Sequence, residues 1–203
     1  PAAAASFNAA TGMVVVANIE ASNSKQIGNI AICTLKGGCT KKLANPNITG
    51  PAVGVALAKN GDCWLVSNNA SRTAGVMTYW AGCTGHGEAV TGFENSSDGS
   101  LSVDKHGNLV SVDHLGGTTG RLWVYSGCNP ACELVGGPFP LEGRALFGAL
   151  NAAGDAFGAT ELTGAVDIYK YSPTELTYEY SFSSGFDSSD YPEGFAYSPG
   201  FKQ

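Results

Sequence analysis

The stretch SDGSLSVDKHGNLVSVDHLGGTTGRLWVY, residues 97–125, contains the structural unit that the rest of the chain repeats. Its pattern predicts an apolar strand, a tight turn at residues 104–107, a second strand, a glycine-rich loop and a third strand. The glycine that closes each tight turn marks the copies of this unit. These turn glycines are Gly12, Gly61, Gly107, Gly154 and Gly200, and they are 49, 46, 47 and 46 residues apart.

A second set of glycines, which opens the third strand of each copy, has nearly the same period. Its members are Gly28, Gly75, Gly120 and Gly164, spaced 47, 45 and 44 residues apart. A period of about 40 to 50 residues indicates a repeat architecture, and repeats made only of strands are typical of propeller blades. No segment shows the sustained periodicity of an amphipathic helix. We therefore predict an all-β fold, a β-propeller of four blades with four antiparallel strands each.

The repeats predict four complete blades and the beginning of a fifth, in a single propeller domain spanning residues 1–203. Residues 191–203 begin the further copy, because YPEGFAYSPG matches a first strand and its turn; this predicts a surplus C-terminal strand. The alternative is a five-bladed propeller whose last blade is completed by the N-terminus or by a neighbouring molecule. The complete repeats are expected at residues 5–48, 51–93, 97–139 and 145–186.

Individual strands carry further expectations. The first strands read ASFN, GVAL, SLSV, FGAL and GFAY, and their small residues predict strands that converge closely around the propeller axis. Residues 40–44 are expected to form an outer strand whose two lysines blunt an exposed sheet edge. Residues 88–93 are expected to form the fourth strand of the second repeat. Residues 176–182, LTYEYSF, alternate apolar and polar side chains, which predicts a last strand with one apolar face.

Composition argues against nucleic-acid and membrane partners. The chain has 11 basic and 17 acidic residues, a net charge of −6, and no basic patch of the kind that binds nucleic acid is evident. No apolar run approaches the ~20 residues needed to span a bilayer. The 28 glycines and the low charged fraction of 14% fit short strands joined by many turns.

The first residues and the cysteines both indicate export. The opening PAAAA resembles the small-residue neighbourhood of a signal-peptidase cut, so we expect a mature protein that is secreted, extracellular or held at the cell surface. A fragment of a longer chain is the alternative. The even number of cysteines, six, and their local clustering favour an oxidising compartment.

The cysteine spacing predicts three disulfides, although the sequence alone does not choose among the pairings. Two of the pairs lie just after a third strand, where a bridge across a short loop is geometrically reasonable. The third pair lies within the second repeat. The candidate pairs are Cys33 with Cys39, Cys128 with Cys132, and Cys63 with Cys83.

A zinc site is the other interpretation of the cysteines. It would use Cys83, His86, Cys128 and Cys132. These residues do not form the two ordered ligand pairs of a zinc ribbon, so zinc is not expected.

Residues 99–113, GSLSVDKHGNLVSVD, resemble the NHL-type repeat, whose pattern is close to G-x-A-V-D-x-x-G-N-L-Y-V-A-D. Residues 192–200, PEGFAYSPG, resemble both these repeats and the gluconolactonase-like (senescence-marker-protein) propellers. The resemblance to NHL-type proteins implies a binding scaffold. The resemblance to gluconolactonase-like proteins implies a metal-dependent hydrolase, usually of about six blades, with a Glu, Asn and Asp set at the channel mouth. The positions that match the NHL pattern are Asp104, Gly107, Asn108, Leu109 and Asp113.

Acidic residues just before the first strands are the candidate metal ligands under this second resemblance. Carboxylate oxygens that converge on one point would hold calcium or another divalent cation. Their distances to the turn glycines differ, and solvated loop carboxylates are the structural alternative. The candidates are Asp98, Glu142 and Glu193. No catalytic residue is assigned, because no Ser-His-Asp order or nucleophile elbow surrounds the three histidines.

Three N-glycosylation sequons occur in predicted loops, where an exported protein could accept a glycan. Chance is the alternative, because the chain is rich in Asn and Ser. The candidate acceptors are Asn47, Asn69 and Asn95.

These observations favour a secreted, non-catalytic propeller that acts as a binding or structural module. Its surplus strand could add to the sheet of a neighbour and build a homo-oligomer or filament head to tail. Another extracellular protein is the alternative partner, and no cofactor is expected. The alternative function is a metal-dependent lactonase or esterase of the gluconolactonase-like type.

Overall fold

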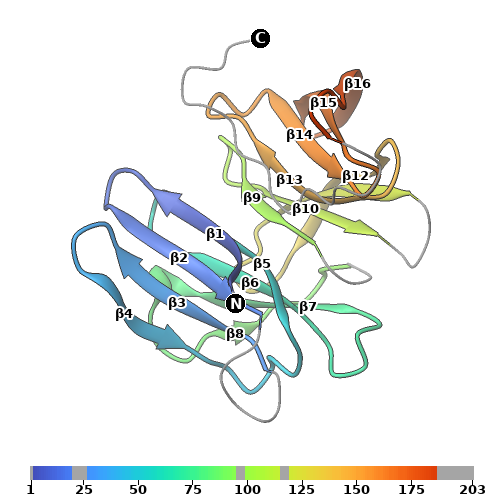
Figure 1. Ribbon diagram of the computed structural model, residues 1–203. Coiled ribbons are helices and arrows are strands. Elements are labelled where there is room, and N and C mark those ends of the chain that lie inside the picture. Colours follow the sequence, from blue (N-terminus) through green and yellow to red (C-terminus); the bar gives the residue numbers. More distant parts are fainter. Residues whose placement is uncertain (1, 20–26, 95–98, 115–118, 187–203) are drawn as a thin grey trace. The chain divides into compact units, whose positions relative to one another are not determined.

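The computed structural model of this chain describes residues 2–19, 27–94, 99–114 and 119–186. These residues form four sheets of four antiparallel strands, and the strands of each sheet follow one another in sequence order (Figure 1). The predicted fold class is confirmed: the described residues are all-β, and their sheets are four-stranded blades of the four-bladed propeller type. In the described part of the chain, no helix is long and apolar enough to cross a membrane.

The chain divides into two compact units, each with two blades. The first unit comprises Pro1–Asp98 and Gly127–Glu133, and the second comprises Gly99–Ser126 and Leu134–Gln203.

The first unit contains blades 1 and 2. Blade 1 consists of β1 (Ala2–Asn8), β2 (Met13–Asn18), β3 (Asn29–Thr34) and β4 (Gly38–Leu43). Blade 2 consists of β5 (Ala52–Leu57), β6 (Cys63–Asn68), β7 (Gly75–Trp80), the 3₁₀ turn η1 (Ala81–Cys83) and β8 (Glu88–Ala89). The strand β8 is shorter than the predicted segment 88–93.

The second unit contains blades 3 and 4. Blade 3 consists of β9 (Leu101–Val103), β10 (Leu109–His114), β11 (Gly120–Ser126) and β12 (Glu133–Pro140). Blade 4 consists of β13 (Ala145–Leu150), β14 (Ala156–Glu161), β15 (Ala165–Ser172) and β16 (Glu175–Phe182).

The outermost strand of blade 4 does not present the single apolar face that its alternation predicts. In the register with β15, Tyr178 is paired with Tyr169, and Tyr180 is paired with Ile168. Neighbouring residues of a strand point to opposite faces, so the bulge at Glu179 places Tyr178 and Tyr180 on opposite faces of the sheet.

The turn between the first two strands of each blade needs a glycine, as the period predicted. The backbone φ is +69° at Gly12, +94° at Gly61, +88° at Gly107 and +67° at Gly154. This left-handed region is open to glycine without the steric penalty that a Cβ brings. Gly200, the fifth member of the set, lies outside the described residues.

A polar side chain at the start of the turn holds it in three of these blades. The Oδ1 atom of Asn8 accepts backbone N–H groups of its turn, and Asp104 and Asn151 do the same in blades 3 and 4. Two of them also contact the next blade of their unit. The Nδ2 of Asn8 donates to the Ala58 carbonyl at 2.9 Å, and the Tyr171 hydroxyl donates to Asp104 Oδ2 at 3.2 Å.

Each unit buries its own apolar core between its two blades. The core of the first unit is centred on residues of β2, β5 and β6 that include Val15, Val55 and Leu65. The core of the second unit is more aromatic and includes Phe157, Tyr169 and Tyr171. Burial of apolar surface is the main favourable term in folding, so each pair of blades has its own source of stability.

The inner strands of neighbouring blades lie close together, as their small residues predicted. In the first unit, the Ser6 hydroxyl of β1 accepts the backbone N–H of Leu57 on β5 at 3.2 Å. In the second unit, the Ser100 hydroxyl accepts the backbone N–H of Gly148 on β13 at 2.9 Å, in a buried position. The same serine-to-backbone bond therefore joins the inner strands in both units.

A second close approach repeats where the third strand begins. A Cβ atom on Gly28 would lie 2.4 Å from the backbone nitrogen of Ala52, and one on Gly120 would lie 2.8 Å from the carbonyl oxygen of Ala145. These distances leave no space for a side chain. The second set of periodic glycines is thus explained, at these two positions, by contact with the first strand of the following blade.

The three predicted disulfides are present. The first joins β3 to β4, the second joins β6 to η1, and the third closes the loop between β11 and β12; no described cysteine is free. Structural disulfides form and persist in oxidising compartments. The pairs are Cys33 with Cys39, Cys63 with Cys83, and Cys128 with Cys132.

Removing the buried hydroxyl between the inner strands of the second unit should destabilise it. Ser100→Ala leaves the Gly148 N–H without its acceptor, and an unsatisfied buried donor costs about 1 to 3 kcal/mol. Urea unfolding followed by tryptophan fluorescence measures this loss. The control is Ser102→Ala, at a half-buried position on the adjacent β9, which should change stability by less than about 0.5 kcal/mol. Equal stabilities of the two variants would contradict the assignment.

Candidate functional site

Of the three acidic residues predicted as metal ligands, only Glu142 lies within the described residues. Asp98 and Glu193 fall outside them. Glu142 occupies the exposed loop between β12 and β13, and its backbone N–H donates to the hydroxyl of Tyr169 at 2.7 Å. Through this contact the loop is fixed against β15, where a second acidic residue lies.

The acidic residues that the structure brings together are Asp167 on β15 and Glu161 on β14. In the strand register Asp167 is opposite Ala159 and Glu161 is opposite Ala165, so both side chains point to the same face of blade 4. The Asp167 side chain is fully buried, whereas Glu161 is half-buried. We refer to these two residues as the acid pair.

The two oxygens of the Asp167 carboxyl group differ in their partners. One, Oδ1, accepts the hydroxyl of Ser181 on β16. The other, Oδ2, is buried and has no hydrogen-bond donor among the described residues. A buried carboxylate oxygen without a donor is costly, so this environment favours the protonated form of the Asp167 carboxyl group.

Electrostatics at the acid pair favour the protonated form. Burial raises the pKa of Asp167 to about 7, and the bond to Glu161 and the negative charges of Glu161 and Glu142 act in the same direction. The hydroxyl of Ser181 opposes them, because it stabilises the carboxylate. Burial also raises the pKa of Tyr169 well above its ordinary value, so this phenol stays protonated.

Glu161 is held from two sides. The hydroxyl of Thr163 donates to Glu161 Oε2 at 2.6 Å. On the other side lies Gly143, with φ +59°, where a Cβ atom would stand 2.3 Å from the same oxygen. Glycine is favoured here by the backbone conformation, and its lack of a side chain lets the loop lie directly against the Glu161 carboxyl group.

The acid pair lies on two strands of blade 4 and does not form a metal centre in the described structure. Among the described residues, no three His, Cys, Asp or Glu side chains form a group that could hold a metal ion. A carboxyl group with a raised pKa can act as a general acid when a substrate reaches it. Asp167 is completely buried, and its hydrogen bond to Ser181 joins β15 to β16.

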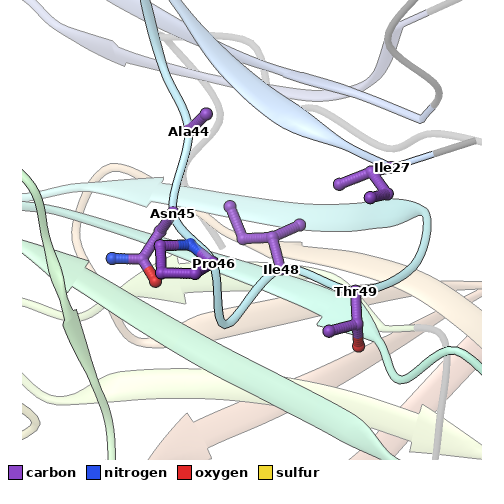
Figure 2. Close-up of a pocket in the computed structure, with 6 residues that line it drawn as sticks. All are labelled: Ile27, Ala44, Asn45, Pro46, Ile48 and Thr49. Carbon is purple, nitrogen blue, oxygen red and sulfur yellow. The ribbon is translucent and has the colours of Figure 1, made fainter. Parts of the chain in front are cut away.

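A shallow cavity of about 420 Å³ lies in the first unit (Figure 2). It is lined by the segment after β4 and by one residue before β3, and its walls are mainly apolar. The amide of Asn45 donates to the carbonyls of His86 and Gly87, so its donor group is already used. Among the described residues, no titratable side chain lines this cavity. The lining residues are Ile27, Ala44, Asn45, Pro46, Ile48 and Thr49.

Two of the three predicted glycan acceptors lie in the described loops. Asn47 is half-buried beside the cavity. Asn69 begins a turn in which its Nδ2 donates to the Thr73 hydroxyl at 3.1 Å and its Oδ1 accepts the Thr73 N–H at 2.8 Å. Asn95 lies outside the described residues.

Several residues singled out by motif have structural roles. Asp113 is fully buried and forms a bidentate pair with Arg121, at 3.0 Å to Nε and 2.8 Å to Nη2. Trp64 donates to the carbonyl of Cys128 at 2.6 Å. The cysteines of the alternative zinc site are all in disulfides, so they cannot serve as thiolate ligands.

Sequence reasoning did not single out Asp167 or Glu161. The available signal was an aspartate enclosed by apolar residues in the strand AVDIYKYS, since a charged residue within such a strand is rarely buried without a partner. Its partner on β14 could be identified only once the register of the two strands was known.

Comparison of the sequence with models of protein families and with curated proteins found no match in either. The resemblance to NHL-type and gluconolactonase-like repeats therefore rests on the motifs alone.

The stability of the protein should fall as the pH rises through neutrality. An unfolded aspartate has a pKa of about 3.9, below the folded value. Between the two values the folded state keeps a proton that the unfolded state has lost, so stability that is fully present below about pH 4 is lost as the pH passes about 7. Urea unfolding at pH 5, 6, 7 and 8 measures the slope.

The variant Asp167→Asn should flatten this slope. An amide keeps the shape, accepts the Ser181 hydroxyl and carries no charge at any pH, so we expect about 1 to 3 kcal/mol more stability than the wild type at pH 8. Glu175→Gln, an exposed change on the same blade, is the control and should follow the wild-type slope. A wild-type slope in Asp167→Asn would contradict the assignment of this pH dependence to Asp167.

Proposed function

We propose that this protein is a secreted, non-catalytic β-propeller that serves as a binding or structural module and assembles head to tail through its surplus C-terminal strand. The observation that carries this proposal is the completeness of the four sheets. Each contains four strands supplied by consecutive residues between Ala2 and Phe182. The first-strand pattern at residues 191–200 therefore repeats a strand that every blade already has.

The sequence at residues 191–200 has the pattern of a strand that can extend the sheet of another molecule. Addition of an extended segment to a sheet edge gives affinity through backbone hydrogen bonds. A contact between two different surfaces of identical molecules does not close on itself unless rotation brings it back, and it can continue as a filament. The partner of this proposal is a second copy of the chain, and another extracellular protein is the alternative.

The disulfides support an extracellular location for the module. All six cysteines are paired in disulfides, which is typical of proteins in oxidising compartments.

The cavity in the first unit has no titratable lining residue among the described residues, and the buried Asp167 of the second unit joins β15 to β16. The apolar lining of the cavity and the burial of Asp167 favour binding over catalysis.

Removal of residues 190–203 tests the proposal. The full chain should elute from size-exclusion chromatography earlier than a monomer, with a peak that moves with protein concentration. The truncated chain should elute as a monomer, because the donor strand is missing. Its thermal unfolding midpoint should match that of the full chain, which shows that the blades remain folded. Identical monomer peaks for both chains would overturn the proposal.

A further inference from the structure

The loop between β6 and β7 contains a sequon, Asn69-Ala70-Ser71, that the proposed function does not use. An N-linked glycan needs an asparagine in a surface loop, with a serine or threonine two residues further on. The structure describes this loop completely, from Asn69 to Ala74, and its hydrogen bonds and exposure meet that need in several ways.

Backbone bonds give the loop a defined shape. The Asn69 N–H donates to the Ala74 carbonyl at 2.9 Å, and the Arg72 N–H donates to the Asn69 carbonyl at 2.9 Å. Arg72 has φ +57°, in the left-handed region that residues other than glycine rarely adopt. The loop is therefore a tight turn, and the residues at its tip, 70–73, are all exposed.

The side chain of Asn69 is anchored within this turn. Its Oδ1 accepts the Thr73 N–H at 2.8 Å, and its Nδ2 donates to the Thr73 hydroxyl at 3.1 Å. A backbone N–H can only donate, so the first of these bonds identifies the amide oxygen and fixes which atom is the nitrogen. The amide of Asn69 thus has one orientation, set by an exposed residue of its own loop.

The hydroxyl that completes the sequon lies beside this amide. The Ser71 Oγ donates to Asn69 Oδ1 at 3.3 Å and is 3.0 Å from the Thr73 hydroxyl. The asparagine and the serine that a glycosyltransferase must recognise are therefore together on the surface of a single turn.

A glycan on Asn69 preserves the bonds of the turn. The Nδ2 of asparagine carries two hydrogens, and one of them is used by the Thr73 hydroxyl. An N-glycosidic bond replaces one hydrogen and keeps the other, so the remaining N–H continues to donate to Thr73. The Oδ1 atom is unchanged and still accepts the Thr73 N–H. The turn does not have to unfold to carry the sugar.

The other described sequon, Asn47-Ile48-Thr49, is fixed to the body of the first unit. The Oδ1 of the buried Asn45 accepts the Asn47 N–H at 2.8 Å, and its carbonyl accepts the Ile48 N–H at 3.0 Å. Ile48 is 2% exposed and belongs to the apolar core, and Figure 2 shows it with Thr49 in the wall of the cavity. An enzyme that takes hold of the residues on both sides of Ile48 must withdraw this side chain from the core.

We propose that Asn69 carries an N-linked glycan in the exported protein and is preferred to Asn47 as the acceptor. The middle residue of its sequon, Ala70, is exposed, so the segment can enter a transferase without disturbing a core. The sugar donor is an oligosaccharide joined to a lipid through pyrophosphate. The bond from Nδ2 to the sugar C1 forms, the bond from C1 to the pyrophosphate oxygen breaks, and the lipid pyrophosphate leaves. The displaced amide proton passes to a base of the transferase.

This site depends on the export that the proposed function includes, but it does not depend on assembly. The loop joins the ends of β6 and β7, whereas strand addition takes place along the edge of a sheet. A chain without residues 190–203 should therefore carry the same glycan as the full chain. Loss of association in that chain tests assembly, and the mass of its glycan tests the modification.

Secretion of the full chain from a eukaryotic host, behind a cleavable signal peptide, tests the site. Peptide-N-glycosidase converts each glycosylated asparagine to aspartate, and treatment in heavy-oxygen water labels that aspartate. Peptide mapping by mass spectrometry should find the label at residue 69 in most molecules and at residue 47 in few. A sequon appended to the C-terminus of the same chain verifies that the molecules met the transferase.

Variants separate the acceptor from the turn that presents it. Ser71→Ala removes the sequon hydroxyl and leaves both bonds between Asn69 and Thr73, so the glycan at residue 69 should be lost. Ser71→Thr restores a hydroxyl and should keep the glycan. Thr73→Ala removes one bond of the turn but leaves the sequon intact, so it should also keep the glycan. Asn47→Gln is the matched change in the other sequon and should leave occupancy at residue 69 unchanged.

Three results would overturn the proposal. The first is an unmodified residue 69 in molecules whose appended sequon is glycosylated. The second is an occupancy at residue 47 that equals or exceeds the occupancy at residue 69. The third is a modification at residue 69 that persists in Ser71→Ala, because an N-linked glycan requires the hydroxyl. Circular dichroism verifies that every variant is folded.

Discussion

The close approach of each blade to the first strand of the next, within both units, is the constraint on which the rest of the structure depends. Where β3 begins, Gly28 leaves no space for a Cβ against Ala52, and Gly120 meets Ala145 in the same way at the start of β11. Interiors at this packing density do not absorb an extra methyl group without a shift of backbone. The close approach of neighbouring blades therefore explains both the small residues of the first strands and the periodic glycines, which recur about every 46 residues.

This requirement acts on the inner strands and leaves the outer strands free to differ. The inner pairs are joined by equivalent bonds, through the Ser6 hydroxyl in one unit and the Ser100 hydroxyl in the other. The outer strands, by contrast, have lengths from two to eight residues and carry lysines, a Gly-Gly-Pro interruption or aromatic side chains. The repeated parts of the sequence thus specify the fold, whereas the outer strands differ from blade to blade. Asp167 also contributes to the fold, because its bond to Ser181 joins β15 to β16.

Local features of the sequence predicted the blades well, because the signals that define them lie within a few residues. A turn that needs a positive φ, as at Gly61 and Gly107, can be recognised without knowledge of the rest of the molecule. Features that depend on pairing could not be predicted in the same way. The end of β8 at Ala89 follows from the contact of Thr91 with a segment some 40 residues away in sequence. Asp167 and its partner likewise lie on different strands, and their proximity is a property of the register.

The path of the chain between the two units has a consequence for how the molecule can be divided. The polypeptide enters the second unit at Gly99, returns to the first with Gly127–Glu133, and leaves it again at Leu134. No single cut in the polypeptide separates the units, because a half-molecule that ends at Asp98 lacks the segment that lies along Thr91. A half-molecule cut at that point would keep the Thr91 N–H and carbonyl without their partners on Pro130 and Cys132.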